Sequence, residues 1–229
     1  MLEDGSVYEG TARGDFKETA CEIVFNTSMT GYVEILTDPS YAGQGVVMTY
    51  PMIGNYGISR EDFESERLQP SAFIVHELSS DPSNFRCTDT IENLLKEYNI
   101  PCISGVDTRA VVKKLRESGT MRGVLTSDIG DRERLMDVIK SFRQIDLVGS
   151  VTAKQTKVYG EENTGAEIAL MDFGTKRNII NNLVKRNCIV TVYPSFTSAD
   201  EIIKTSPDGI MLSNGPGDPS ECVDIIKEI

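Results

Sequence analysis

The chain has 229 residues, of which 39% are hydrophobic and 25% charged, a composition typical of soluble globular proteins. Its formal net charge of -12, from 35 acidic and 23 basic residues, argues against nucleic acid and anionic membranes as partners, because both require a basic face. No apolar run approaches the length of a membrane span, and the N-terminal stretch lacks the basic and apolar segments of a signal peptide. We therefore expect a cytoplasmic protein.

The cysteines and the histidine give little support for a metal or nucleophile site. The five cysteines show no CxxC pair or regular spacing and are odd in number, so neither zinc nor a disulfide framework is expected; they are Cys21, Cys87, Cys102, Cys188 and Cys222. Cys102 and Cys188 stand in apolar runs, which predicts small buried thiols. The single histidine, His76, closes an apolar run. A Cys–His pair would have to use it, but we interpret it as structural.

Residues 1–152 read as a separate α/β domain in which short strands alternate with helices. Strand-like apolar runs lie at 21–27, 45–51, 71–77 and 101–105. Helical spacing of apolar residues predicts helices over 89–99, 107–119 and 132–142. Asp107 is the expected cap of the second helix and Gly119 its stop.

The segment Asn26 to Gly57 is unusually poor in charge, with Glu34 and Asp38 as its only ionised side chains. It also holds four tyrosines, Tyr32, Tyr41, Tyr50 and Tyr56. Such a segment favours contact with another domain, a ligand or another chain, and an ordinary irregular core is the alternative. Within it, "TDPSY" predicts a turn in which Asp38 and Ser40 bond nearby backbone.

A polar stretch, 153–166, predicts a linker, and residues 167–229 follow a cleaner pattern. Near-continuous apolar runs at 167–173 and 188–194 predict strands buried in a parallel sheet, and 209–214 predicts a third strand. Helical spacing lies between them, and Ser198 with Glu201 fits a capping box. The order β-α-β-α-β-α predicts the first half of a doubly wound sheet. The last helical pattern stops without a C-cap glycine, so we expect the sequence to be cut there.

The third of these strands runs into a corner rich in glycine and proline, "NGPGDP". Asp218 is the expected cap of the next helix, Pro219 its first residue and Glu221 the reciprocal cap. Gly215 and Gly217 would let backbone N–H groups approach a ligand, and the helix N-terminus would add positive potential. This arrangement suits an anion or a developing oxyanion, whereas a tight, well-capped turn is the structural alternative. The sequence has no P-loop, no GxGxxG after a strand, no HExxH and no nucleophile elbow.

The longest motifs resemble one family. "LSNGPGDP", preceded by "MDFGTKRNI", resembles the glycine loop of class I glutamine amidotransferases. "FNTSMTGYVEILTDPSYAGQ", "TYPMIGNYG", "SNFR" and "GVDTRAVVKKLRESG" resemble the glutamine-hydrolysing small subunit of carbamoyl-phosphate synthases. The resemblance covers essentially the whole chain, in order. An amidotransferase that feeds a different synthase is disfavoured because such proteins lack this front domain.

The resemblance implies an activity and a set of site residues. Family members hydrolyse L-glutamine through a thioester and pass ammonia to a large synthetase subunit, which uses ATP and Mg to make carbamoyl phosphate for arginine and pyrimidine synthesis. Ser40 matches a family contact to glutamine, and Gly215 and Gly217 match backbone contacts, with Gly215 as an oxyanion donor. The nucleophilic cysteine and its histidine and glutamate are expected beyond Ile229, so no residue of this chain receives a catalytic role.

Two further expectations follow from this resemblance. The chain should dock on the large subunit, forming a heterodimer, chiefly through residues 1–152 and their low-charge segment. It should carry no cofactor or metal itself and should not hydrolyse glutamine as written. The alternative function is a non-catalytic docking module for a synthetase subunit.

Overall fold

The computed structural model describes residues 1–143 and 146–229, which form two compact units. Unit 1 comprises Met1–Thr37 and Gly43–Gln144, and unit 2 comprises Asp38–Ala42 and Ile145–Ile229. The short segment Asp38–Ala42 thus belongs to unit 2, although it lies far from the rest of that unit in the sequence. None of the described helices is both long enough and apolar enough to cross a membrane.

Unit 1 is a mixed α/β structure, as the sequence predicts. Its strands are β1 (Thr11–Gly14), β2 (Thr19–Asn26), β3 (Gln44–Met48), β4 (Met52–Ile53), β5 (Ala72–Ile74), β6 (Glu77–Leu78), β7 (Pro101–Ser104) and β8 (Met121–Leu125). Its helices are α1 (Tyr32–Thr37), the 3-10 turn η2 (Arg60–Asp62), α2 (Ile91–Glu97), α3 (Thr108–Ser118) and α4 (Arg132–Ser141).

A six-stranded sheet of order β1-β7-β5-β3-β2-β8 forms the frame of unit 1. The four central strands are parallel, and the edge strands β1 and β8 are antiparallel to their neighbours. Helix α3 packs its apolar stripe, Val111 and Leu115, on side chains of the sheet such as Ile23 and Val47. The buried face of α3 is thus the one that its apolar spacing predicts.

Local signals at the ends of α3 are confirmed. Asp107 accepts a hydrogen bond from the Ala110 N–H, and Gly119 ends the helix with a φ of 84°. The strand prediction for 45–51 ran too long, because β3 ends at Met48 and the chain then turns into the short β4.

The low-charge segment Asn26 to Gly57 uses two of its tyrosines internally. Tyr32 is buried and stacks on Tyr56, with ring centroids 4.1 Å apart. The Tyr32 hydroxyl donates to the Gly57 carbonyl oxygen at 2.8 Å, and the Tyr56 hydroxyl accepts from the Gly31 N–H at 2.6 Å. For these residues the structure therefore supports the core interpretation, and contact with a partner would have to use other side chains of the segment.

Unit 2 contains the 3-10 turn η1 (Pro39–Tyr41) and the C-terminal elements. Its strands are β9 (Lys157–Tyr159), β10 (Glu167–Asp172), β11 (Ile189–Pro194) and β12 (Gly209–Leu212). Its helices are α5 (Leu147–Val151), α6 (Arg177–Val184), α7 (Ala199–Ile203), the 3-10 turn η3 (Pro219–Glu221) and α8 (Val223–Glu228).

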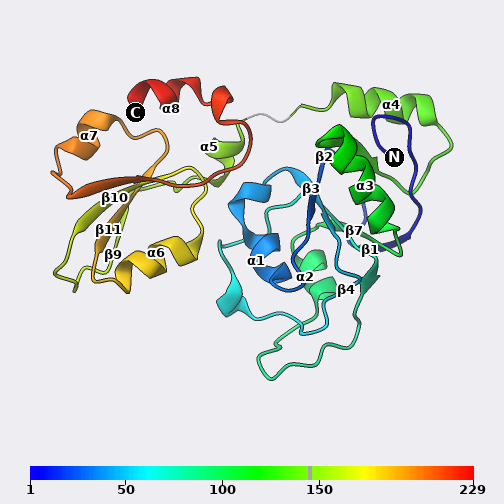
Figure 1. Ribbon diagram of the computed structural model, residues 1–229, viewed down its shortest axis with the longest axis horizontal. Helices are drawn as coiled ribbons and strands as arrows, with labels where there is room; N and C mark the ends of the chain where they lie inside the picture. Colours follow the sequence, from blue (N-terminus) through cyan, green and yellow to red (C-terminus); the bar gives the residue numbers. More distant parts are fainter. Residues whose placement is uncertain (144–145) are drawn as a thin grey trace. The chain divides into compact units, whose positions relative to one another are not determined.

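The sheet of unit 2 has the order β12-β10-β11-β9, with β10 parallel to both β11 and β12. The first strand of the α/β pattern thus lies between the second and third, as a doubly wound sheet requires. Ile179 and Leu183 of α6 pack with Leu170 and Val190 on one face of the sheet. Ile202 of α7 packs with residues of the opposite face, so the two helices cover opposite faces (Figure 1).

The compact units divide the chain at a different place from the predicted domain boundary at residues 152 and 153. Residues 153–166, expected to be a linker, include β9, which pairs antiparallel with β11 and forms an edge of the sheet. Helix α5 also belongs to unit 2. The strand is short and carries a lysine and a tyrosine, so its sequence has no apolar run by which to recognise it.

Candidate functional site

The strands β10 and β12 end side by side, and the segments that follow them are tied together. The Ser213 N–H donates to the Met171 carbonyl oxygen at 3.1 Å, and the Phe173 N–H donates to Ser213 Oγ at 2.9 Å. The carboxyl edge of such a sheet is where ligands bind in open α/β folds. The glycine corner therefore begins at a position that hydrogen bonds to the segment after β10 hold in place.

Asp172, the last residue of β10, organises this platform. Its buried carboxylate accepts from the N–H groups of Gly174 at 2.9 Å and Thr175 at 2.7 Å through Oδ1, and from Ala153 at 2.7 Å through Oδ2. Thr152 Oγ1 donates to the Asp172 carbonyl oxygen at 2.5 Å. The negative charge is buried only because these donors replace its water shell.

The turn η1 is held on unit 2 by an ion pair and a close contact. Asp38 accepts from the Ser40 N–H at 2.9 Å and pairs with Lys176 Nζ at 2.7 Å. Gly174 has a φ of 127°, and a Cβ added there would lie 3.0 Å from Pro39 Cβ. A side chain at position 174 would therefore strain the backbone and press on η1.

These contacts bring Ser40 to the glycine corner. Asn214 Nδ2 donates to Ser40 Oγ at 2.8 Å, across a sequence separation of 174 residues. Two of the predicted site elements, the "TDPSY" turn and the "NGPGDP" corner, thus meet in unit 2. Sequence reasoning singled out Ser40 but missed Asn214, for which the only signal was its place directly before Gly215.

Each glycine of the corner has a steric reason to be glycine. A Cβ added at Gly215 would overlap the carbonyl oxygen of Phe173. Gly217 has a φ of 79°, and a Cβ there would lie 3.2 Å from Leu147 Cδ1. Within residues 1–143 and 146–229, the N–H groups of Gly215 and Gly217 have no hydrogen-bond acceptor. The structure therefore supports both the tight turn and a pair of backbone donors free for a ligand.

The predicted cap Asp218 and first residue Pro219 are confirmed, but they begin a 3-10 turn and not the α-helix, and the reciprocal cap by Glu221 is not formed among the described residues. Asp218 accepts from the Ser220 N–H and caps η3, whereas α8 begins at Val223 with no side-chain cap bond. Pro219 lies in η3, and the Glu221 carboxylate has no capping bond among the described residues. Because a separate 3-10 turn intervenes, the helix N-terminus does not add its positive potential at the glycines.

Carboxylates dominate the surroundings of Gly217 instead. A cavity of about 260 Å³ borders Gly217 and is lined by four acidic residues, Asp146, Asp218, Glu221 and Asp224. Hydrogen bonds from the Ser220 backbone and side chain hold the pKa of Asp218 below its usual range, so this carboxylate stays ionised at neutral pH. These carboxylates favour a cationic group of a ligand beside Gly217. An oxygen of the ligand would have to be bound by the backbone N–H groups of Gly215 and Gly217.

The thiols and the imidazole do not meet in a catalytic arrangement. Cys21 and Cys102 are buried, and desolvation raises the pKa of each thiol to about 12. His76 Nδ1 lies 3.1 Å from the Val106 carbonyl oxygen, as a structural role requires. In the described part of the chain no Cys–His hydrogen bond and no metal-binding group of three His, Cys, Asp or Glu residues is found. Cys102 confirms the prediction of a buried thiol, whereas Cys188 is half-buried.

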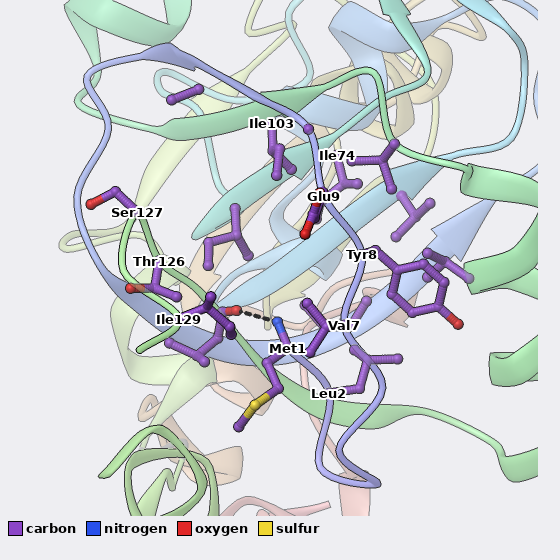
Figure 2. A pocket seen from close by; sticks show the side chains of 18 of the residues that line it. Met1, Leu2, Val7, Tyr8, Glu9, Ile74, Ile103, Thr126, Ser127 and Ile129 are labelled. Atoms are coloured by element: carbon purple, nitrogen blue, oxygen red, sulfur yellow. Dashed lines mark hydrogen bonds between the residues drawn. The ribbon is translucent and has the colours of Figure 1, made fainter. Parts of the chain in front are cut away.

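A cavity of about 450 Å³ lies in unit 1 (Figure 2). Its walls are mainly aliphatic and include Ile74, Ile103 and Val7. The Met1 ammonium group donates to the Val124 carbonyl oxygen at 2.9 Å, and desolvation lowers its pKa. Few polar side chains reach this cavity, so its chemistry does not match that of a hydrolytic site.

Comparison with known protein families agrees with the resemblance of the sequence motifs. The family model for the carbamoyl-phosphate synthase small chain, CPSase domain, matches residues 1–125, and that for class-I glutamine amidotransferases matches residues 169–229.

Curated relatives extend the match over all of this chain. The carbamoyl phosphate synthase small chain of Clostridium perfringens is 47% identical over 230 residues, which is 65% of the relative. The proteins of the same name from Listeria monocytogenes and Bacillus cereus are 45% and 47% identical, each covered to 63%. The chain thus spans 63–65% of the length of these relatives. With one family model matching more than half of its residues, the chain belongs to the carbamoyl-phosphate synthase small chain family.

Proposed function

We propose that this chain supplies the glutamine-binding part of a glutamine-dependent carbamoyl-phosphate synthase. In this proposal it binds L-glutamine for hydrolysis, and the ammonia serves a large synthetase subunit that makes carbamoyl phosphate from bicarbonate and ATP, for arginine and pyrimidine synthesis. Family membership supports the general role. The single observation that carries the site is the 2.8 Å hydrogen bond from Asn214 Nδ2 to Ser40 Oγ, which joins η1 to the glycine corner.

The chemistry of this corner suits an α-amino acid with a carboxamide side chain. The Ser40 hydroxyl and the N–H groups of Gly215 and Gly217 are donors for carboxylate and carbonyl oxygens. The acidic cavity beside Gly217 favours an ammonium group. We assign Ser40, Gly215 and Gly217 as contacts to L-glutamine, with Gly215 as the donor to the oxygen that becomes negative during acyl transfer.

The binding test compares two serines of the purified 229-residue chain. Ser40→Ala should weaken binding of L-glutamine about five- to tenfold, because a lost hydrogen bond costs on the order of 1 kcal/mol. The matched control is Ser28→Ala, an exposed serine of the same low-charge segment. Calorimetric titration with L-glutamine, and with D-glutamine as the control ligand, measures the effect. Equal affinity of the unchanged chain for both enantiomers would contradict the proposed site.

A second candidate function, a non-catalytic docking module, is favoured by the state of the thiols. Among the described residues no cysteine is paired with a base, and a nucleophile for acyl transfer needs one within hydrogen-bond reach. The test is ammonia release from L-glutamine by the chain mixed with a large subunit, beside single Cys-to-Ser variants. Turnover lost on replacing one cysteine would identify a nucleophile and exclude the docking module.

The partner and the location complete the proposal. We assign ATP and Mg to the large subunit, no cofactor or metal to this chain, a heterodimer as the assembly, and the cytoplasm as the compartment. We assign docking chiefly to unit 1, because most of the low-charge segment, which carries family motifs, belongs to this unit and exposes Met29 and Met52. Met29→Glu should reduce co-purification with the large subunit, and Phe196→Glu, at an exposed position of unit 2, should not. If Phe196→Glu reduced co-purification and Met29→Glu did not, the docking surface would belong to unit 2.

A further inference from the structure

Asn214 is held on both sides by the frame of unit 2. Its carbonyl oxygen accepts from Ser213 Oγ at 2.7 Å, and the same Ser213 Oγ accepts from the Phe173 N–H at 2.9 Å. Its side chain then reaches Ser40, where Nδ2 donates to Oγ at 2.8 Å. The Asn214 backbone is therefore tied through Ser213 to the residue that follows β10, and its side-chain amide is bonded to Ser40.

This contact decides what the Ser40 hydroxyl can do. A hydroxyl has one hydrogen to donate and two lone pairs to accept with, and Asn214 Nδ2 occupies one lone pair. Among the described residues no acceptor takes the Ser40 hydroxyl hydrogen. Asp38 is occupied elsewhere, since Oδ1 accepts from the Ser40 backbone N–H and Oδ2 pairs with Lys176. The hydroxyl hydrogen is thus left for a ligand.

The other end of the Asn214 amide gives an independent observation. Its Oδ1 is enclosed, and no donor within residues 1–143 and 146–229 reaches it. Buried acceptors without a partner are rare in native proteins and call for an explanation at each occurrence. Here the explanation is that the donor end must face Ser40, because the reversed amide would accept the hydroxyl hydrogen and withdraw it from the ligand.

We propose that Asn214 is a positioning residue for substrate binding: it fixes the Ser40 hydroxyl as a donor toward an acceptor oxygen of the amino acid ligand. The inference rests on the proposed glutamine site and deepens it. According to this inference, residue 214 must donate a hydrogen bond to Ser40 Oγ, and the volume of its side chain is not the decisive property.

The test is a double-mutant cycle between positions 40 and 214, with L-glutamine affinity of the full 229-residue chain as the readout. Asn214→Asp keeps the size of the side chain but replaces the donor by an acceptor. It should weaken L-glutamine binding roughly tenfold in the Ser40 background and less than about twofold in the Ser40→Ala background, because contacting residues couple and independent ones add. Asn182→Asp, on the exposed side of α6, carries the same charge change and should stay within about twofold in both backgrounds.

A second variant keeps the test independent of the added charge. Asn214→Ala leaves the Ser40 hydroxyl free to rotate and should weaken binding by about two- to fivefold, again only when Ser40 is present. Equal losses in both backgrounds, for either variant, would show that position 214 acts without Ser40 and would overturn this inference alone. Failure of the unchanged chain to bind L-glutamine would overturn the proposed function and this inference with it.

Discussion

The two units differ in how completely they bury their apolar residues. Unit 1 packs α3 on its six-stranded sheet, and Leu2 forms a bridge to Gly123 at the β8 edge. In unit 2, β12 is an edge strand with half-exposed Ile210 and Leu212, and α6 has no fully buried residue. Ile203, Val223, Ile226 and Ile229 are exposed as well.

The position of the site and the stability of the chain therefore depend on different interactions. Ser40 and the glycine corner lie in the less completely buried unit, yet hydrogen bonds and the Asp38–Lys176 ion pair hold them in place. Exposed apolar surface on an edge strand adds no folding free energy and invites association. Equivalent changes in the two units should therefore have different effects.

Thiol labelling should show the largest difference. Cys21 and Cys102 of unit 1 are buried with raised pKa values, whereas Cys87 of unit 1 and both cysteines of unit 2, Cys188 and Cys222, are half-buried. At pH 8 the unit 2 thiols should react more than about a thousandfold faster than Cys21 and Cys102, since buried thiols react only after the surrounding structure opens. Mass spectrometry of labelled peptides measures each rate, and urea-unfolded chain is the control. Labelling of Cys21 as fast as Cys188 would remove the distinction between the units.

The second comparison uses one substitution in both units. Phe73→Ala removes a fully buried ring from β5 and should lower the free energy of unfolding by about 3–5 kcal/mol. Phe196→Ala removes a ring that is 72% exposed and should change it by less than about 0.5 kcal/mol. Urea unfolding followed by circular dichroism gives both values. A loss above about 2 kcal/mol for Phe196→Ala would mean that unit 2 buries this ring in solution.

The third comparison stays within unit 2 and separates the corner from its sheet. Gly215→Ala should cost about 1–3 kcal/mol, because the new methyl group overlaps the Phe173 carbonyl oxygen. Gly209→Ala is the matched control, since its added Cβ would meet only Ile168 Cδ1 at an ordinary 3.5 Å. Thermal unfolding of both variants tests the difference. Equal melting temperatures would show that the corner relaxes without strain.

The smallest effect concerns a surface ion pair of unit 1. Arg134, bonded to Glu18 at 2.7 Å, lowers the pKa of that carboxyl to about 2. A carboxylate with a depressed folded-state pKa stabilises above its unfolded value, and this stabilisation is lost as the pH falls from about 4.5 to 2. Glu18→Gln should make the acid-induced loss of stability less steep over that range than in the unchanged chain. Identical pH profiles for the variant and the unchanged chain would show that water screens the pair completely.

Features that depend on neighbours along the chain could be predicted from the sequence. Apolar spacing predicted the parallel strands β10, β11 and β12 and the faces of α3 and α6, because side-chain direction follows the helical and strand periods. Asp107 and Gly119 marked the ends of a helix through hydrogen bonds and backbone angles within one turn. The motifs around Ser40 and Gly215 were sufficient to indicate the family.

The tertiary structure alone decided which of these residues meet. The Ser40–Asn214 contact joins positions 174 residues apart, and the place of Asp38–Ala42 in unit 2 depends on Lys176 and Gly174. Asn214 could be proposed as a positioning residue only from the fold, in which its Nδ2 donates to Ser40 Oγ and its Oδ1 has no hydrogen-bond partner among the described residues. The physical reason is that packing and hydrogen-bond geometry between distant segments are set by the complete fold, whereas a local sequence pattern encodes only propensity and period.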